Sequence, residues 1–222
     1  MAPDASVGAD SGRSSHSSGN AYRDRPTRVI ESAPPQVNVK GDPRLGSPVA
    51  KIGIVEFSDY QCSYCRDFHR RQFAQLKKEY VGTGVVQFIH KDMPLRMHAQ
   101  AVPAALRART VGAQGRFWDM HDALFDHQDR LGQKLYPELA RQLKLDETKF
   151  NICLERQIPG QGIEQDVGTA RRLGLTGTPS FLIGTIEGDV LTVVRQSRGA
   201  PEFAVFAQEI EKLRQSPAVA PR

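Results

Sequence analysis

Residues 51–65 read KIGIVEFSDYQCSYC, an apolar run, a short polar break and two cysteines. The run at 51–57 is rich in β-branched side chains without sustained alternation, which is typical of a strand buried on both faces of a sheet. From Cys62 the spacing changes to that of one helical face, ending near Gly82 and Gly84. The members of this face are Cys65, Phe68, Phe73, Leu76 and Tyr80. The stretch therefore predicts a strand and then a helix whose N-terminus is Cys62.

The segments around this strand and helix predict an α/β fold. Strands are expected at 37–39 and 85–90, an antiparallel hairpin at 180–183 and 190–194, and a last helix at about 201–213. The first helix between two strands predicts a right-handed βαβ unit with parallel strands. Residues 97–174 carry helical periodicity in five pieces, too much for one crossover. We therefore expect an inserted helical subdomain.

The chain is expected to form one domain between two disordered tails. Its first 28 residues offer only Met1, Val7 and Tyr22 as bulky apolar side chains, too few to offset the entropy of ordering. The predicted division is a tail at 1–34, a domain at 35–216 with its helical insertion at about 95–174, and a tail at 217–222.

The composition argues against a nucleic-acid partner and a membrane span. The formal net charge is +5, but basic and acidic residues are interleaved and no aromatic-plus-basic platform occurs. No run of 18 apolar residues exists, and the N-terminus lacks the apolar stretch of a secretory signal. Two explanations stay open, a cytosolic protein or one from which a signal or anchor has been removed.

Cys62 and Cys65 are separated by two residues directly after a strand, which favours a redox pair over a zinc ribbon. The helix N-terminus offers free N–H groups and a positive dipole end, which stabilise a thiolate at Cys62 and lower its pKa. Cys65, one turn further, lies within reach to resolve a mixed disulfide. The pair is predicted to be a two-electron switch that needs neither a cofactor nor a metal.

Glu56 and the segment at Thr178 and Pro179 are further candidates. Glu56 ends a strand predicted to be buried, so we expect it to relay a proton to or from Cys65, with a pKa raised by burial. The alternative is that strand alternation turns Glu56 toward water or a lysine. Pro179 precedes the strand at 180–183, a position that removes no ladder hydrogen bond and leaves a cis bond possible.

The stretches VEFSDYQCSYC, GRFWDMHDALF and GTPSFLIG, in this order, resemble the DsbA-like branch of the thioredoxin superfamily. The resemblance covers about residues 37–214 and implies a thioredoxin domain with a helical insertion. It also implies that Cys62 is an exposed nucleophile, that Cys65 is a buried resolving cysteine, and that Glu56 is a buried acid.

The resemblance further implies a cis bond between Thr178 and Pro179, in a loop that faces the disulfide and binds extended substrate. Tyr64 is placed with these two residues as substrate-binding. The best-known strongly oxidising members carry Pro-His between the cysteines, whereas this chain has Ser63 and Tyr64. Without that cation the reduced pair is less favoured, which moves the expected potential toward the isomerase range.

The other cysteine and the histidines have structural interpretations. Cys153 is expected to be a buried core thiol, with a regulatory or intermolecular disulfide as the alternative. Residues 117–125, FWDMHDALF, are expected to pack in the core rather than to bind a cofactor. Solvated or hydrogen-bonded roles are expected for the remaining histidines, which are His90, His98, His121 and His127.

The predicted function is thiol-disulfide exchange with protein dithiols, most often forming disulfides in unfolded or cysteine-containing clients and needing a redox partner for recycling. Client disulfides persist in an oxidising compartment, so a periplasmic or other extracytoplasmic site is expected. The alternatives are reduction or isomerisation by the same pair, chaperone-like client holding, or a metal site. The metal site would use Cys62, Cys65 and His69, which share one helical face.

Overall fold

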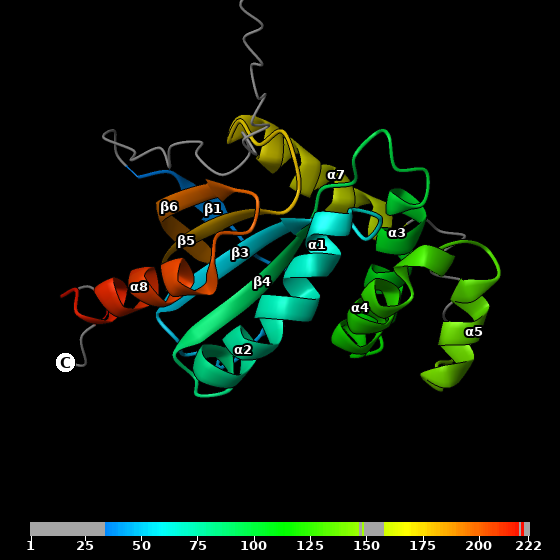
Figure 1. The fold of residues 1–222 in the computed structure, drawn as a ribbon, viewed down its shortest axis with the longest axis horizontal. Helices are drawn as coiled ribbons and strands as arrows, with labels where there is room; N and C mark the ends of the chain where they lie inside the picture. The colour runs from blue at the N-terminus through cyan, green and yellow to red at the C-terminus, as the bar shows by residue number, and fades with distance from the viewer. Residues whose placement is uncertain (1–33, 147, 149–157, 218, 220–222) are drawn as a thin grey trace, which may run out of the picture.

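The structure, a computed structural model, describes residues 34–146, 148, 158–217 and 219. Its centre is a six-stranded sheet in the order β1-β6-β5-β3-β4-β2 (Figure 1). The strands are β1 (Gln36–Asn38), β2 (Arg44–Leu45), β3 (Ile52–Ser58), β4 (Val86–Asp92), β5 (Ser180–Glu187) and β6 (Val190–Arg198). β3 and β4 are parallel, and the other neighbouring pairs are antiparallel. The predicted parallel pair and the hairpin are confirmed.

The chain after β3 forms one long helical segment that begins at the cysteine pair. It consists of α1 (Ser63–Phe68), a π-helical turn (His69–Phe73), α2 (Ala74–Leu76) and a second π-helical turn (Lys77–Val81). The π turn explains why Phe68 and Phe73 share a face, with ring centroids 6.0 Å apart and both rings buried. The helix ends before Gly82, as predicted.

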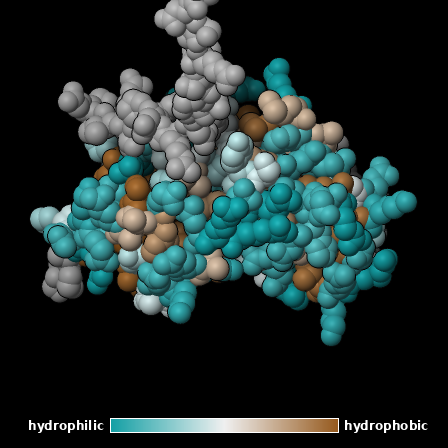
Figure 2. Space-filling model, viewed as in Figure 1, coloured by the Kyte–Doolittle hydropathy of each residue, from teal (hydrophilic) through white to brown (hydrophobic). Residues whose placement is uncertain are grey.

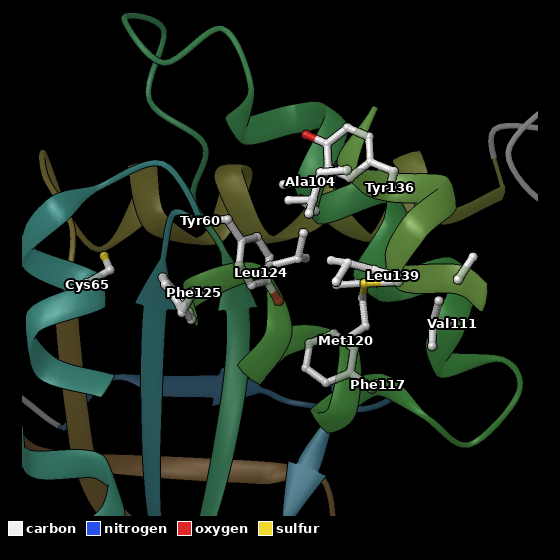
Figure 3. Close-up of a cluster of buried hydrophobic side chains, with 14 of the residues drawn as sticks. Tyr60, Cys65, Ala104, Val111, Phe117, Met120, Leu124, Phe125, Tyr136 and Leu139 are labelled. Atoms are coloured by element: carbon white, nitrogen blue, oxygen red, sulfur yellow. The ribbon is translucent and has the colours of Figure 1, made fainter. Parts of the chain in front are cut away.

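The predicted helical insertion lies between β4 and β5. It contains α3 (Ala101–Gly112), α4 (Phe117–Asp126), a 3-10 turn (Gln128–Arg130), α5 (Leu135–Gln142) and α7 (Ile158–Arg172). Figure 1 shows α3, α4 and α5 grouped beyond α1, to one side of the sheet. Phe117, Met120 and Leu124 pack in a buried cluster of this insertion (Figure 3). Core packing by FWDMHDALF is therefore confirmed.

β3 lies inside the sheet, between β5 and β4, and both of its faces are covered. All of its residues are buried. Ile52 and Ile54 pack with side chains of α1 and of the last helix, α8 (Phe203–Arg214). Val55 and Phe57, on the opposite face, pack with Ala170 of α7. The apolar run without alternation was thus a correct signal for a strand buried on both faces.

One strand was not predicted, and several element boundaries differ from the prediction. β2 forms within the segment at 41–48 that was predicted to be a turn, where Arg44 pairs with Ile89. A strand of two residues carries no periodicity, so the sequence offers no signal for it. β4 continues to Asp92, beyond the predicted end at His90, and α3 begins at Ala101 rather than at residue 97.

Several predictions fall on parts of the chain that the structure does not describe. Cys153 lies outside the described residues, as do 1–33 of the predicted N-terminal tail and most of the predicted C-terminal tail. Among the residues that are described, no helix has the length and apolar character needed to cross a membrane. The face in Figure 2 is mainly hydrophilic, with small and separate hydrophobic patches.

Candidate active site

Cys62 and Cys65 lie at the start of α1, directly after the loop that follows β3. Cys62 is the N-cap residue, and its carbonyl accepts a hydrogen bond from the Arg66 N–H at 3.2 Å. Both cysteines are free thiols, and Cys65 is completely buried. Cys62 is only 5% exposed, so the prediction of an exposed nucleophile is wrong for this structure. The cause is the loop before β5, which covers its sulfur.

That loop carries Thr178 and Pro179. The Cys62 Sγ donates a hydrogen bond to the carbonyl oxygen of Thr178 over 3.4 Å. The peptide bond between Thr178 and Pro179 is cis, as the family resemblance implied. The Gly199 N–H donates to the Pro179 carbonyl at 2.7 Å, which ties the loop to the end of β6. The structure therefore places the predicted loop directly against the Cys62 thiol.

The surroundings of Cys62 stabilise its thiolate. The pKa of Cys62 is lowered to about 6, mainly by a hydrogen bond from the Cys65 side chain. Burial opposes this shift, while hydrogen bonds from the backbone N–H groups of Cys65 and Tyr64 support it. Thioredoxin and DsbA thiols have pKa values of about 7 and about 3.5, so Cys62 falls between them.

Cys65 has the opposite electrostatics. Burial raises the pKa of Cys65 well above its ordinary value, and the hydrogen bond to Cys62 and the negative charge of Glu56 raise it further. A hydrogen bond with Ser58 opposes the shift. At neutral pH the pair therefore holds one thiolate, at Cys62, and one proton, at Cys65.

Glu56 is fully buried in β3. Its Oε1 accepts a hydrogen bond from the Ser58 hydroxyl at 2.8 Å, and its Oε2 lies 3.0 Å from the His69 Nε2. The alternative of a side chain turned toward water or a lysine is thus wrong. Ser58 also bonds to Cys65, so its hydroxyl lies between Glu56 and the buried thiol.

The predicted direction of the Glu56 pKa is also wrong. Burial alone would raise the pKa of Glu56, but the positive charge and the hydrogen bond of His69 outweigh burial and lower it. His69 lies thirteen positions later in sequence. The carboxylate is therefore the ordinary state of this buried acid.

Glu56 is surrounded by three histidines from three elements, and we call this group the histidine cluster (Glu56, His69, His90, His121). His90 pairs with Glu56 across β3 and β4. The ring centroid of His121, in α4, lies 4.5 Å from that of His69 and 5.2 Å from that of His90. Burial and the charge of His69 lower the pKa of His121 to about 3. Sequence reasoning missed this cluster, because no local spacing links the three elements.

The expected roles of the histidines are partly confirmed. Solvated roles are wrong for His90 and His121, which are completely buried, whereas hydrogen-bonded roles hold for both. The His90 Nε2 lies 3.0 Å from an Asp92 carboxylate oxygen, and the His121 Nδ1 lies 2.9 Å from one of Asp122. His98 likewise contacts Asp59 at 2.8 Å.

The structure does not assemble the alternative metal site of Cys62, Cys65 and His69. Among the described residues, the groups whose potential ligand atoms all lie within 4.8 Å of one another contain no cysteine. His69 contacts Glu56 instead, although it shares a helical face with the cysteines. In the described residues, the cysteine pair therefore has no third metal ligand beside it.

The insertion positions the cysteine loop through a residue that sequence reasoning missed. Gln128, after α4, donates hydrogen bonds from Nε2 to the carbonyls of Tyr60 and Cys62 at 2.7 and 2.9 Å. Tyr60 and Cys65 belong to the same buried cluster as the core of the insertion (Figure 3). Tyr64, between the two cysteines, is 62% exposed. The exposed side of the site thus carries the ring of Tyr64, and the buried side carries the carboxylate of Glu56.

This arrangement agrees with a comparison to known families. A protein-family model described as Thioredoxin matches residues 38–191. The chain belongs to the thioredoxin family. The matched part runs from β1 into β6, so it includes the cysteine pair, the insertion and the cis-proline loop.

This thioredoxin-family protein is similar to several known proteins. It is 32% identical to the Na(+)/H(+) antiporter NhaA 3 of Salinispora tropica over 62% of this chain and 21% of the antiporter. It is 27% identical to the disulfide bond formation protein D of Bacillus subtilis over 67% of this chain and 70% of that protein. The crystal structure of alpha-DsbA1 from Wolbachia pipientis matches with a TM-score of 0.69 and 26% identity, over 78% of this chain and 91% of that one.

These similarities confirm the predicted resemblance to DsbA-like proteins and the thioredoxin-like fold with a helical insertion. The chain spans about a fifth of the length of the two Salinispora antiporters, at 21% of each. It spans most of the Bacillus and Wolbachia proteins. The similarity to the antiporters is thus confined to a part of those proteins.

Proposed function

We propose that this protein is a thiol-disulfide oxidoreductase that exchanges the Cys62–Cys65 disulfide with protein dithiols, and that it acts mainly as an oxidase. The observation that carries the proposal is the divided pKa of the pair, about 6 at Cys62 and raised at Cys65. A stabilised thiolate at Cys62 favours the reduced pair and so strengthens the disulfide as an oxidant.

The reaction has two steps. A client thiolate attacks the Cys62 sulfur of the disulfide, a client–Cys62 bond forms, and the Cys62–Cys65 bond breaks with Cys65 leaving as a thiolate that takes a proton. A second client thiolate then attacks the client sulfur, and Cys62 leaves as a thiolate. The client loses two electrons to the cysteine pair. Cys62 is a good leaving group in the second step because its pKa is low.

Glu56 and Ser58 are proposed to handle the proton of Cys65. The Ser58 hydroxyl contacts both the carboxylate and the buried thiol, so it can pass a proton in either direction. Glu56 is ionised, which suits a group that accepts the Cys65 proton when the partner protein reoxidises the pair. His69, 3.0 Å from the carboxylate, stabilises that charge.

Clients are proposed to be extended, cysteine-containing chains that bind beside Tyr64 and along the loop at Thr178 and Pro179. Tyr64 supplies exposed apolar surface, and the loop lies against Cys62. A separate redox partner must remove the electrons after each turnover. Client disulfides last only in an oxidising compartment, so an extracytoplasmic site is proposed.

Two measurements test the proposal. The oxidised protein should form disulfides in a reduced, unfolded client. The Cys62 thiolate of Cys65→Ser should attack the disulfide of an oxidised client and trap that client as a mixed disulfide, releasing one client thiolate, whereas Cys62→Ser should trap none. Equilibration with glutathione buffers should give a potential between the thioredoxin and DsbA values of about −270 and about −120 mV. A potential at or below about −270 mV, together with efficient client reduction, would instead establish a reductase.

A further inference from the structure

The centre of the histidine cluster has the composition of a metal site. Glu56, His90 and His121 each offer a potential ligand atom, and these three atoms lie within 4.8 Å of one another. All three side chains are completely buried. The exchange reaction proposed above does not use His90 or His121. It uses Glu56 only to exchange a proton with Cys65.

The hydrogen bonds of the two histidines fix which ring nitrogens are free. The His90 Nε2 faces Asp92, and the His121 Nδ1 faces Asp122. Since a carboxylate only accepts hydrogen bonds, the imidazole nitrogen facing it carries the proton. In a neutral imidazole the other nitrogen carries the lone pair, and here these nitrogens are His90 Nδ1 and His121 Nε2, each buried with no partner among the described residues.

This pattern is the one that metal-ligating histidines show. Such histidines donate their second N–H to a carboxylate, which orients the ring and makes the ligating nitrogen more basic. Both carboxylates are themselves held, because Arg109 contacts Asp92 and Lys77 lies 3.2 Å from Asp122. Two buried nitrogen lone pairs without a partner also carry a desolvation cost that a bound cation would remove.

We propose that Glu56, His90 and His121 form a buried site for a divalent transition metal of the zinc class. Two imidazoles and one carboxylate are a donor set that zinc uses when one coordination position stays open. Nitrogen donors favour zinc, copper or nickel over magnesium and calcium. His69, whose Nδ1 is buried and has no partner among the described residues, packs against His121 with ring centroids 4.5 Å apart.

A cavity lies next to this site. A cavity of about 150 Å³ between the first helical segment and α4 is lined by side chains that include His69, Asp122 and Phe125. The potential ligand atoms of His69, His121 and Asp122 form a second group within 4.8 Å of one another. His69 and Asp122 line this cavity, and they also contact the proposed ligands Glu56 and His121.

Occupancy of the site has a consequence that rests on the proposed function. A metal on Glu56 takes up the carboxylate that exchanges the Cys65 proton through Ser58. The bound ion therefore slows the proton step of the exchange. Metal binding itself does not depend on that function, because no cysteine is a ligand.

The test uses the full chain carrying Cys62→Ser and Cys65→Ser, which cannot exchange disulfides and offers no thiolate at the pair. Zinc is titrated against a chromophoric chelator, and cobalt is added as a spectroscopic probe. We expect one ion per chain and a cobalt spectrum without a thiolate charge-transfer band. His121→Gln in this background should abolish binding, whereas the matched substitution His127→Gln should leave it unchanged.

A second variant covers the case in which His121→Gln does not fold. Asp122→Asn changes a half-exposed side chain that orients His121, and it should weaken binding about 10- to 100-fold. Failure to bind one ion would overturn the proposal and leave buried water as the partner of the free nitrogens. Binding that His121→Gln or Asp122→Asn does not weaken would overturn it as well. Either result leaves the exchange activity, measured on the unmodified cysteine pair, untouched.

Discussion

Two groups of buried charges meet at β4 and differ in the side chains that compensate their carboxylates. The histidine cluster surrounds Glu56 with imidazoles. The second group, which we call the arginine–lysine network, uses an arginine and a lysine and consists of Asp42, Lys91, Asp92, Arg109 and Asp166. In it, the Lys91 Nζ lies 2.6 Å from an Asp42 oxygen and 2.7 Å from an Asp166 oxygen. Arg109 contacts both Asp92 and Asp166.

The charges of the arginine–lysine network stabilise the fold, whereas the charges of the histidine cluster take part in the chemistry. The carboxylates of Asp92 and Asp166 raise the pKa of Arg109, so Arg109 stays charged, and the ion pairs of the network join β4, α3 and α7. Imidazoles gain and lose protons and bind metals, so the charge around Glu56 is adjustable. Asp92 belongs to the network and also bonds to His90, so the arginine–lysine network orients one histidine of the histidine cluster.

The largest effect is expected from breaking the network. Lys91→Met leaves the carboxylates of Asp42 and Asp166 buried without their ammonium partner, which should cost about 3–5 kcal/mol of unfolding free energy. Denaturant titration measures the loss. The exposed pair of Arg116 and Asp119 is the control, since Arg116→Ala should cost no more than about 1 kcal/mol.

The reduction potential of folded Lys91→Met should equal that of the wild type, because Lys91 contacts neither cysteine nor Glu56 in the described hydrogen bonds and ion pairs. A large shift of the reduction potential at unchanged stability would contradict this comparison. It would mean that the arginine–lysine network affects the redox reaction rather than the stability of the fold.

The second largest effect is expected at Glu56. Glu56→Gln keeps the shape but removes the acceptor of the Cys65 proton, so reoxidation of the reduced pair by oxidised glutathione should slow by about 10²-fold, the lower end for a positioned acid–base group. Removing the negative charge should also lower the pKa of Cys65, which Glu56 raises. Stopped-flow kinetics across pH measure both changes.

Glu209→Gln is the matched control, because Glu209 is also largely buried and is paired with Arg195 at 2.7 Å. It should leave the kinetics unchanged. An unaltered pH profile in Glu56→Gln would remove the proposed proton role and leave Glu56 as a structural partner of His69.

The sequence predicted those features that depend on neighbours along the chain. β3 and the helix after Cys62 have strong local signals, namely an apolar run and a helical face. The hairpin of β5 and β6 is marked by two strand patterns and a turn. The roles of Cys62 and Cys65 follow from spacing and from the resemblance, and they stay predictions until exchange is measured.

The features that escaped prediction depend on long-range packing. His90 reaches Glu56 only through the pairing of β3 with β4, and His121 only through the position of α4. The sign of the Glu56 pKa was wrong for the same reason, because burial was visible in the pattern but the ring of His69 was not. The loop that covers Cys62 likewise comes from the other end of the domain.

A smaller effect on client oxidation is expected at Ser58, which links the histidine cluster to the cysteine pair. Ser58→Ala removes the hydrogen bond that lowers the pKa of Cys65, so that pKa should rise further. Client oxidation should slow by about tenfold, equivalent to the roughly 1.4 kcal/mol of one hydrogen bond. The pH dependence of Cys65 alkylation checks the first change, and client oxidation checks the second. Thr110→Val, which removes another buried hydroxyl, is the control and should change neither.

A further effect is expected in the pH dependence of stability, and above about pH 6.5 it comes from Cys62. Its pKa is about 6 in the folded protein and about 8.5 for a free cysteine. Between these values the unfolded chain holds more protons, so the free energy of unfolding of the reduced protein should rise with pH.

This contribution is complete above about pH 8.5 and is lost as the pH falls through 6. Denaturant titrations of reduced wild type and Cys62→Ser should therefore diverge as the pH rises from 6 to 8, with the wild type gaining. The oxidised protein has no Cys62 thiol to titrate, so this part of the pH dependence should be missing from it. Parallel curves for reduced wild type and Cys62→Ser would mean that the Cys62 thiolate is no more stable in the folded site than in the unfolded chain. In that case, the folded site would not activate Cys62 as a nucleophile.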